Sequence, residues 1–169
     1  MIRNTVLLLS GLLMVSTVGI TTPAVAETAS EEIDARAKNP DWWPAPGRDN
    51  KLTRHSNLKD INLDNVGKLK YVWSQSTGAL RGHEGQPVVV EHDGKPMMYF
   101  SSGCPNMAQC NIVQALDLTD PDNPIQIWNY VKKTDRDESA VPRACCDTVH
   151  RGVNYAKNKV IYHTFVVYR

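Results

Sequence analysis

Two things are scarce in this sequence: excess charge of either sign, and strongly apolar runs beyond its first residues. Lysine and arginine together number 19 and aspartate and glutamate 18, which leaves a formal net charge of +1. No run of basic residues interrupts this balance. Proteins that bind nucleic acid or anionic membranes carry concentrated basic patches. The composition therefore argues against both classes of partner.

The most apolar stretch, residues 6–20, lies at the amino terminus. Arg3 places a positive charge before it, and Ala24-Val25-Ala26 has the small-residue pattern of a cleavage site. We interpret residues 1–26 as a secretory signal peptide, with an uncleaved anchor as the alternative. No cysteine follows the cleavage point, which argues against a lipoprotein anchor. We therefore expect a periplasmic protein without a membrane span after cleavage.

The next residues are expected to form a lead-in arm. A short helix is predicted within residues 27–39, with a solvated charged face made of Glu31, Glu32, Asp34 and Arg36. Prolines and glycine then break regular structure at residues 41–48. We expect Trp42 and Trp43 to pack this arm against the body of the protein, because large aromatic side chains bury much apolar area.

The rest of the chain predicts short strands separated by turns, as in an all-β protein. Residues 61–67 predict a turn or a single helical turn. Residues 68–74 alternate apolar and polar side chains, with Leu69, Tyr71 and Trp73 on one face, and predict a half-buried strand. An Asp-Gly pair predicts a tight hairpin turn at residues 92–95. Further strands are expected at residues 87–91, 96–101, 112–116, 125–130, 153–155 and 160–165.

The four cysteines form two groups, Cys104 with Cys110 and Cys145 directly before Cys146. In an oxidising compartment we expect them to be paired. Spacing alone leaves three arrangements open: a bond between the two neighbours, cross-bridges between the groups, or a four-thiolate zinc site. A bond between neighbours would close a strained ring that contains a peptide bond. Arg151 follows closely and could clamp a carboxylate beside such a ring.

A second candidate site residue lies in the motif Gly82-His83-Glu84-Gly85. Glycines on both sides let a loop approach a ligand closely. From the residues alone, a solvent-facing turn glutamate is the simpler interpretation of Glu84. We expect His83 to be a structural neighbour, because no partner stands at metal-ligand spacing. We expect His150 to be exposed. We expect Asp147 either to accept a hydrogen bond from the backbone of the strained Cys-Cys loop or to pair with Arg151.

From residue 43 to about residue 163 the chain resembles the large subunit of the quinoprotein alcohol dehydrogenases, the methanol and ethanol dehydrogenases that use pyrroloquinoline quinone (PQQ). The matching motifs are Pro46-Gly47-Arg48-Asp49, Arg81-Gly82-His83-Glu84-Gly85 with Pro87, Ala115-Leu116-Asp117-Leu118, Ile127-Trp128-Asn129-Tyr130, and Cys145-Cys146-Asp147 with Arg151-Gly152. The resemblance implies an eight-bladed β-propeller. Residues 58–169 would supply its opening blades, truncated, after the signal (1–26) and the arm (27–57). Trp128 would then pack between blades.

The resemblance also implies site roles. In that family adjacent cysteines form a disulfide on one face of the quinone, which favours a Cys145–Cys146 bond here. Glu84 would contact the polar edge of the quinone, and Arg151 would clamp its carboxylates. Because the quinone is a tricarboxylate, Glu84 would have to be protonated or screened by Arg151. We also predict a structural Cys104–Cys110 disulfide, which would restrict the unfolded chain by about 2–3 kcal/mol.

The activity implied by the resemblance is periplasmic oxidation of primary alcohols to aldehydes. It implies PQQ as cofactor, Ca²⁺ or a lanthanide ion beside it, and cytochrome c as electron acceptor. A homodimer or a small partner subunit is also expected. The family's catalytic base and metal ligands are expected downstream, so we predict no catalytic residue and no metal ligand in this chain. We therefore interpret it as an amino-terminal piece without turnover of its own.

Two other function classes stay open on the sequence. One is a non-catalytic periplasmic β-propeller that serves as an assembly or interaction module, although such a module has no need of a strained Cys-Cys ring beside an arginine. The other is a thiol–disulfide redox protein. Such proteins usually have the Cys-x-x-Cys spacing that lowers a thiol pKa. That spacing does not occur in the sequence.

Overall fold

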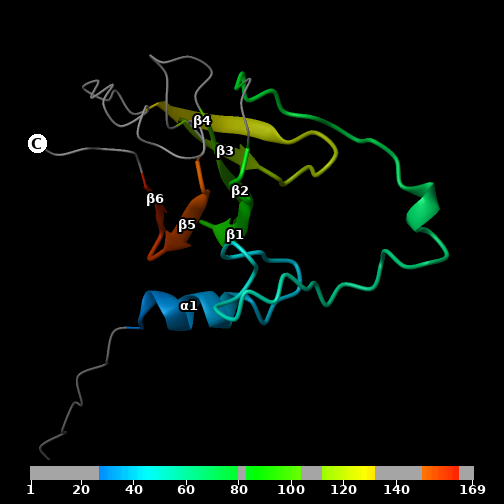
Figure 1. The fold of residues 1–169 in the computed structure, drawn as a ribbon, viewed down its shortest axis with the longest axis horizontal. Coiled ribbons are helices and arrows are strands. Elements are labelled where there is room, and N and C mark those ends of the chain that lie inside the picture. The colour runs from blue at the N-terminus through cyan, green and yellow to red at the C-terminus, as the bar shows by residue number, and fades with distance from the viewer. Residues whose placement is uncertain (1–26, 80–82, 104–111, 132–149, 164–169) are drawn as a thin grey trace, which may run out of the picture.

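The computed structural model describes residues 27–79, 83–103, 112–131 and 150–163, which form two antiparallel β-sheets beside a short helix (Figure 1). The first sheet contains β1 (Val88–His92), β2 (Lys95–Ser102), β3 (Ile112–Asp117) and β4 (Ile125–Val131), in that order. The second is a hairpin of β5 (Val153–Ala156) and β6 (Lys159–Tyr162). The all-β prediction is confirmed. A four-stranded antiparallel sheet of this kind is the form of a propeller blade.

Most of the expected strands lie where the sequence placed them. The first five strands of the two sheets begin and end within one residue of the predicted bounds. The sixth, β6, ends at Tyr162, and residues 164–165 of that prediction lie outside the described residues. The helical turn expected at residues 61–67 is found as η1 (Val66–Lys68), at the end of the predicted range and one residue beyond it.

The predicted hairpin turn joins β1 to β2. His92 pairs with Lys95, and the two residues between them, Asp93 and Gly94, have φ values of 51° and 75°. Positive φ at both central positions matches the right-handed twist of the flanking strands. The turn between β5 and β6 repeats this geometry, with φ values of 51° at Lys157 and 57° at Asn158.

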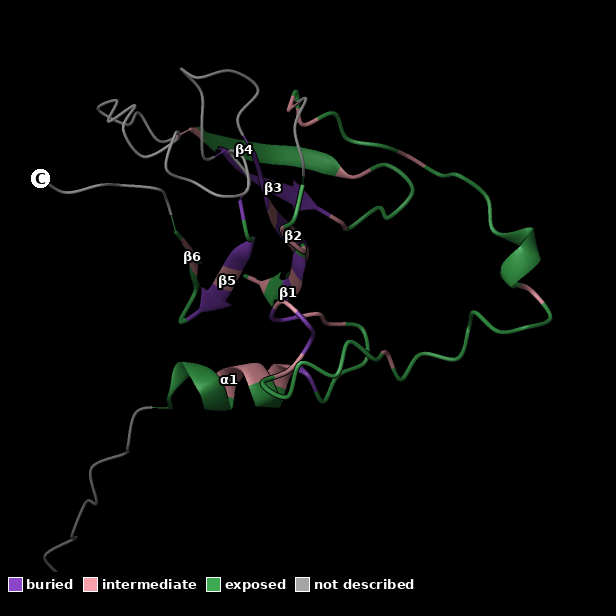
Figure 2. Cartoon of the chain, in the orientation of Figure 1, coloured by how far each residue is buried: buried purple, intermediate pink, exposed green. Residues whose placement is uncertain are grey.

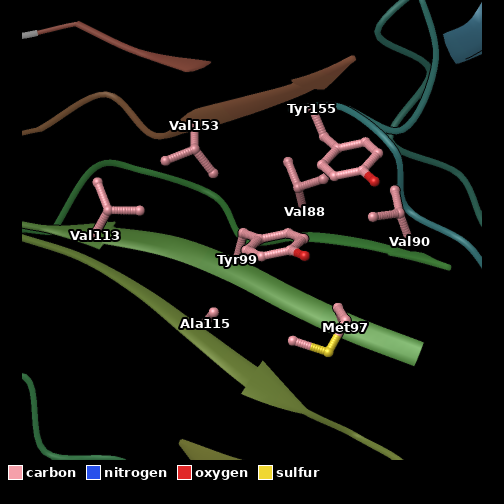
Figure 3. Close-up of a cluster of buried hydrophobic side chains, with 8 residues drawn as sticks. All are labelled: Val88, Val90, Met97, Tyr99, Val113, Ala115, Val153 and Tyr155. Carbon is pink, nitrogen blue, oxygen red and sulfur yellow. The ribbon is translucent and has the colours of Figure 1, made fainter. Parts of the chain in front are cut away.

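The hydrophobic core lies between the first sheet and β5 (Figure 3). The rings of Tyr99 and Tyr155 stack there, with centroids 5.5 Å apart. β3 is buried at every position, whereas β4 is exposed along nearly its whole length (Figure 2). Each large side chain buried here contributes roughly 1.5–3 kcal/mol by leaving water. The buried members of the cluster are Val88, Val90, Met97, Tyr99, Val113, Ala115, Val153 and Tyr155.

A cavity of about 530 Å³ lies between the two sheets. Trp128 on β4 and Tyr162 on β6 both line it. The Trp128 ring also lies 5.9 Å from the Tyr99 ring, measured between centroids. Trp128 is 37% exposed and Tyr99 belongs to the same sheet, so the packing of Trp128 between blades stays a prediction.

The strand predicted at residues 68–74 is wrong. After η1 the backbone is irregular, and Leu69, Tyr71 and Val72 are 61%, 79% and 56% exposed. In Figure 2 this segment belongs to a long exposed excursion from the sheets. An alternating pattern forms a strand only where another strand pairs with its backbone. None of the described residues supplies that partner here.

The helix α1 (Ala29–Arg36) lies beside β1 and β5 (Figure 1). Thr28 caps its first turn, since its hydroxyl accepts from the Glu31 backbone N–H and its own N–H donates to the Glu31 carboxylate. The solvated charged face predicted for this helix is wrong at two positions. Glu32 accepts from the backbone N–H of Lys157 at 2.8 Å, and Arg36 donates to the carbonyl of Glu91 at 3.0 Å. Both side chains lie on the side of α1 that meets the sheets.

The rest of the arm is fastened to the outer edge of β1. Trp43 and Val89 exchange two backbone hydrogen bonds of 2.8 and 2.9 Å. Arg48 is buried and donates to the carbonyl of Ala37 at 2.7 Å. The arm therefore lies against the body at Trp43, as predicted, and the side chains of Trp42 and Trp43 are both half-buried. Among the described residues, no helix is long and apolar enough to cross a membrane.

Candidate functional site

Two loops far apart in the sequence meet where β1 and β5 begin. Gln86 and Gly152 pair as an isolated parallel bridge. A Cβ atom on Gly85 would lie 2.7 Å from the nitrogen and 2.8 Å from the Cα of Gly152, closer than such atoms can approach. Gly152 has a φ of 107°, a conformation that side chains strongly disfavour. Glycine is therefore required at both positions for the loops to touch.

This contact brings together two of the residues that the sequence singled out. The Nε of Arg151 lies 2.8 Å from Oε2 of Glu84, so the two side chains form an ion pair. The side chains are 75% and 41% exposed, so the pair contributes at most about 1 kcal/mol to folding. Its effect is on orientation. The 2.8 Å contact is made by Nε, and a guanidinium also has two terminal nitrogens that can form a two-pronged contact with a carboxylate.

His150, directly before Arg151, is buried, and the prediction that it is exposed is wrong. It is 6% exposed, and its ring lies 5.9 Å from the ring of Tyr162 on β6, measured between centroids. Its Nδ1 accepts a hydrogen bond from the backbone N–H of Gly152 at 3.1 Å. Burial lowers the pKa of His150 from its ordinary value, because a buried imidazolium is poorly solvated.

The arm also reaches this site. The side-chain oxygen of Gln86 accepts from the backbone N–H of Gly47 at 2.8 Å. Gly47 belongs to the Pro46-Gly47-Arg48-Asp49 motif and has a φ of 83°. The adjoining Arg48 also has a positive φ, of 78°, and its side chain is anchored to Ala37. The motif therefore forms a tight turn that fastens the arm beside the Glu84 loop, and its arginine is structural.

Comparison with known proteins shows the family to which the chain belongs. The family model described as "PQQ: Glucose/ethanol/alcohol dehydrogenase, beta-propeller domain" matches residues 43–166. The chain belongs to this family. Both the resemblance and the propeller fold predicted from the motifs are thereby confirmed.

Members of the PQQ alcohol dehydrogenase family are similar over most of the chain. The lanthanide-dependent methanol dehydrogenase of Methylacidiphilum fumariolicum is 41% identical over 136 residues, 80% of this chain and 20% of that protein. Methanol dehydrogenase (cytochrome c) subunit 1 of Methylobacterium organophilum is 39% identical over 127 residues, 75% of this chain and 18% of that protein. A solved europium-containing methanol dehydrogenase superposes with a TM-score of 0.68 at 40% identity, covering 79% of this chain and 21% of that chain. The chain spans about a fifth of the length of these proteins.

The remaining predicted site residues divide into two groups. His83 lies 3.2 Å from the Thr77 hydroxyl through its Nε2, which fits its predicted structural role. Within the described ranges, no three His, Cys, Asp or Glu side chains are grouped as a metal site would need. Cys104, Cys110, Cys145, Cys146 and Asp147 lie outside the described residues, so both predicted disulfides stay predictions.

The sequence pointed to Glu84 and Arg151 but not to the residues that hold them. Gly152 carries a detectable signal, because a glycine directly after a candidate binding residue suggests a close backbone contact. His150 carries none, since its burial depends on Tyr162 in a strand that follows it. The link from Gln86 to Gly47 also joins segments that no local pattern connects.

Proposed function

We propose that this chain supplies part of the PQQ site of an alcohol dehydrogenase that oxidises primary alcohols, of the methanol and ethanol type, to aldehydes. Family membership supports the alcohol dehydrogenase class, and the names of the relatives support methanol and related alcohols. The observation that carries the site is the 2.8 Å ion pair between Glu84 and Arg151. Glu84 and Arg151 come from two family motifs that are distant in the sequence.

The residues present fit a flat quinone with several carboxylates. A guanidinium recognises a carboxylate through two parallel N–H bonds. The Arg151 side chain is 75% exposed, so its guanidinium is accessible for such a contact. The negative charge of Glu84 would repel the carboxylates of the quinone. The guanidinium of Arg151 lies against Glu84, which supports the view that its positive charge screens this repulsion. Gly85 and Gly152 keep Cβ atoms away from the place where the loops meet.

In this proposal the site residues of the chain have different tasks. Arg151 binds a cofactor carboxylate and so fixes the position of the ring. Glu84 holds the guanidinium through Nε and contacts the polar edge of the cofactor. Cys145 and Cys146 form a disulfide that lies against one face of the ring, and Cys104–Cys110 closes a short structural loop. Once bound, PQQ supplies the two-electron acceptor for alcohol oxidation, and Ca²⁺ or a lanthanide ion supplies the positive charge beside it.

The catalytic base and the metal ligands are assigned to parts of the propeller that this chain does not contain. The share of its relatives that the chain spans, about a fifth, supports this assignment. We therefore expect the chain alone to bind PQQ without oxidising alcohol. Export to the periplasm is proposed from the pattern of residues 1–26. The name of one relative supports cytochrome c as acceptor and a second subunit as partner, with a homodimer as the other assembly.

Titration of the purified chain with PQQ, followed by quinone absorbance, tests the proposal. We expect saturable binding that Arg151→Lys weakens about tenfold, because lysine cannot form the two-pronged carboxylate contact. Arg54→Lys, at an exposed position outside the site, serves as the matched control and should keep the wild-type Kd. Equal affinity of Arg151→Lys and wild type would remove Arg151 from the site. Absence of binding by the folded chain would favour a propeller that serves only as an assembly module.

Mass mapping of the oxidised chain tests the disulfide assignment separately. We expect a peptide in which Cys145 and Cys146 are bonded to each other, and a second linkage between Cys104 and Cys110. A linkage between the two groups would contradict the proposed plate beneath the quinone. Free thiols at Cys145 and Cys146 in protein isolated from an oxidising compartment would contradict it too.

A further inference from the structure

We propose that His150 is a positioning residue for the Glu84–Arg151 pair, and that protonation of its imidazole releases Arg151 and weakens cofactor binding in acid. The inference rests on the proposed PQQ site and adds a regulatory property to it. It concerns residues on either side of Arg151, all of which the structure describes.

The hydrogen bond at His150 requires a neutral ring. Nδ1 accepts from the Gly152 N–H at 3.1 Å, so Nδ1 is unprotonated and the ring hydrogen is on Nε2. Nε2 is buried and has no hydrogen-bond partner among the described residues. An imidazolium carries a hydrogen on both nitrogens. Protonation would therefore place two N–H groups opposite each other and break the contact with Gly152.

The broken contact would be transmitted directly to the ion pair. Arg151 is the residue between His150 and Gly152, so their hydrogen bond fixes the turn on which the guanidinium stands. The same turn touches the Glu84 loop, since a Cβ on Gly85 would lie 3.1 Å from the His150 carbonyl oxygen and 2.7 Å from the Gly152 nitrogen. Displacement of Gly152 would separate the two loops and change the 2.8 Å contact of Arg151 with Glu84.

The charged and titratable groups around His150 favour the neutral ring at neutral pH. Burial is the main reason that its pKa is lowered, and the charge of His163 acts in the same direction, while the backbone of His163 acts against it. On β6, Tyr162 lies against the ring and its own pKa is raised to about 12, so its hydroxyl stays neutral. Arg151 and Glu84, the charged groups of the adjoining loops, are paired with each other. The contact is therefore intact at neutral pH and is lost as pH falls below the ordinary range for histidine.

Two variants separate the hydrogen bond from the charge. His150→Asn keeps an acceptor, because an asparagine side-chain oxygen can accept from the backbone N–H two residues on, and it does not titrate. His150→Leu removes the acceptor and also does not titrate. PQQ affinity is measured at about pH 7.5 and about pH 5, on either side of the usual histidine range. Circular dichroism at both pH values verifies that each variant is folded.

We expect wild-type affinity to fall about fivefold to tenfold at the lower pH, the size of effect that one lost hydrogen bond produces. His150→Asn should keep high affinity at both pH values, and His150→Leu should have low affinity at both. An equal pH response in wild type and His150→Asn would overturn the inference, because the acid effect would then arise elsewhere. High affinity of His150→Leu at neutral pH would also overturn it.

A measurement without cofactor makes failure of this inference distinguishable from failure of the PQQ site. In an NMR titration of the free chain, the Gly152 amide signal should shift with the protonation of His150 in wild type and stay constant in His150→Asn. A Gly152 signal that does not follow His150 protonation would refute the positioning role. Absence of PQQ binding in every variant, with the Gly152 shift intact, would instead refute the cofactor site and the acid-sensitive binding built on it.

Discussion

The strands of the sheets and the exposed segment at residues 58–79 share an alternating sequence pattern, but only the sheets form paired strands with buried side chains. Both contain aromatic and branched side chains in alternation. In the sheets Tyr99 is 3% exposed, because β1 and β3 pair with its strand and β5 covers its face. In the excursion Tyr71 is 79% exposed. The alternating pattern therefore predicts only which side chains a strand would bury. Whether the strand forms depends on a second strand that pairs with its backbone.

The largest expected difference comes from removing one tyrosine ring in each region. Tyr99→Ala should lower the free energy of unfolding by about 3–5 kcal/mol, because it deletes a large buried side chain and leaves a cavity. Tyr71→Ala should change it by less than about 0.5 kcal/mol, as exposed substitutions do. Urea unfolding followed by circular dichroism measures both. Equal losses in the two variants would show that residues 68–74 are packed in solution.

Substitution of one glycine in each region compares how closely the backbone is packed there. Gly85→Ala should lower the free energy of unfolding by about 1–3 kcal/mol, because its methyl group would meet the backbone of Gly152. Gly67→Ala, with nothing within 4 Å of its added Cβ, should be neutral or slightly stabilising. The same urea experiment compares them. A neutral Gly85→Ala would mean that the two loops do not touch.

A smaller effect on the free energy of unfolding is expected from the protonation of Asp117 at low pH. The hydroxyl and N–H of Thr119, followed by Lys95, lower the pKa of Asp117 at the end of β3 to about 2. A carboxylate with a lowered folded pKa stabilises the protein above its ordinary pKa, and this stabilisation is lost as pH falls from 3.8 towards about 2. Asp117→Asn should remove this part of the acid dependence, as followed by thermal unfolding across pH. Asp64→Asn, at an exposed turn in the excursion, controls for the lost charge.

The smallest expected effect on stability is at the site itself. Glu84→Gln should change the free energy of unfolding by less than about 1 kcal/mol, since the pair with Arg151 is exposed. PQQ affinity should nevertheless fall, because the guanidinium loses the group that holds it. Thermal unfolding and cofactor titration of the same sample separate the two quantities. A large loss of stability with unchanged affinity would make the pair structural.

The sequence predicted what depends on nearby residues. The Asp93-Gly94 turn and the strands around it were found because turn chemistry and alternation act within a few positions. The family motifs also predicted that Glu84 and Arg151 contact the same cofactor. The burial of His150 could not be predicted, because it is produced by packing against Tyr162. The exposure of residues 68–74 was missed for the same reason, since it depends on whether another strand pairs with them.

The arm makes the two edges of the first sheet different, because it pairs with only one of them. Trp43 occupies the free edge of β1 through two backbone hydrogen bonds, so that side is closed to further pairing at Val89. On the opposite side, no described strand pairs with the outer edge of β4, where Ile125 and Ile127 are 63% and 52% exposed. An open edge with apolar side chains is a template for another strand. Among the described strands, β4 is therefore the edge at which a further strand can pair.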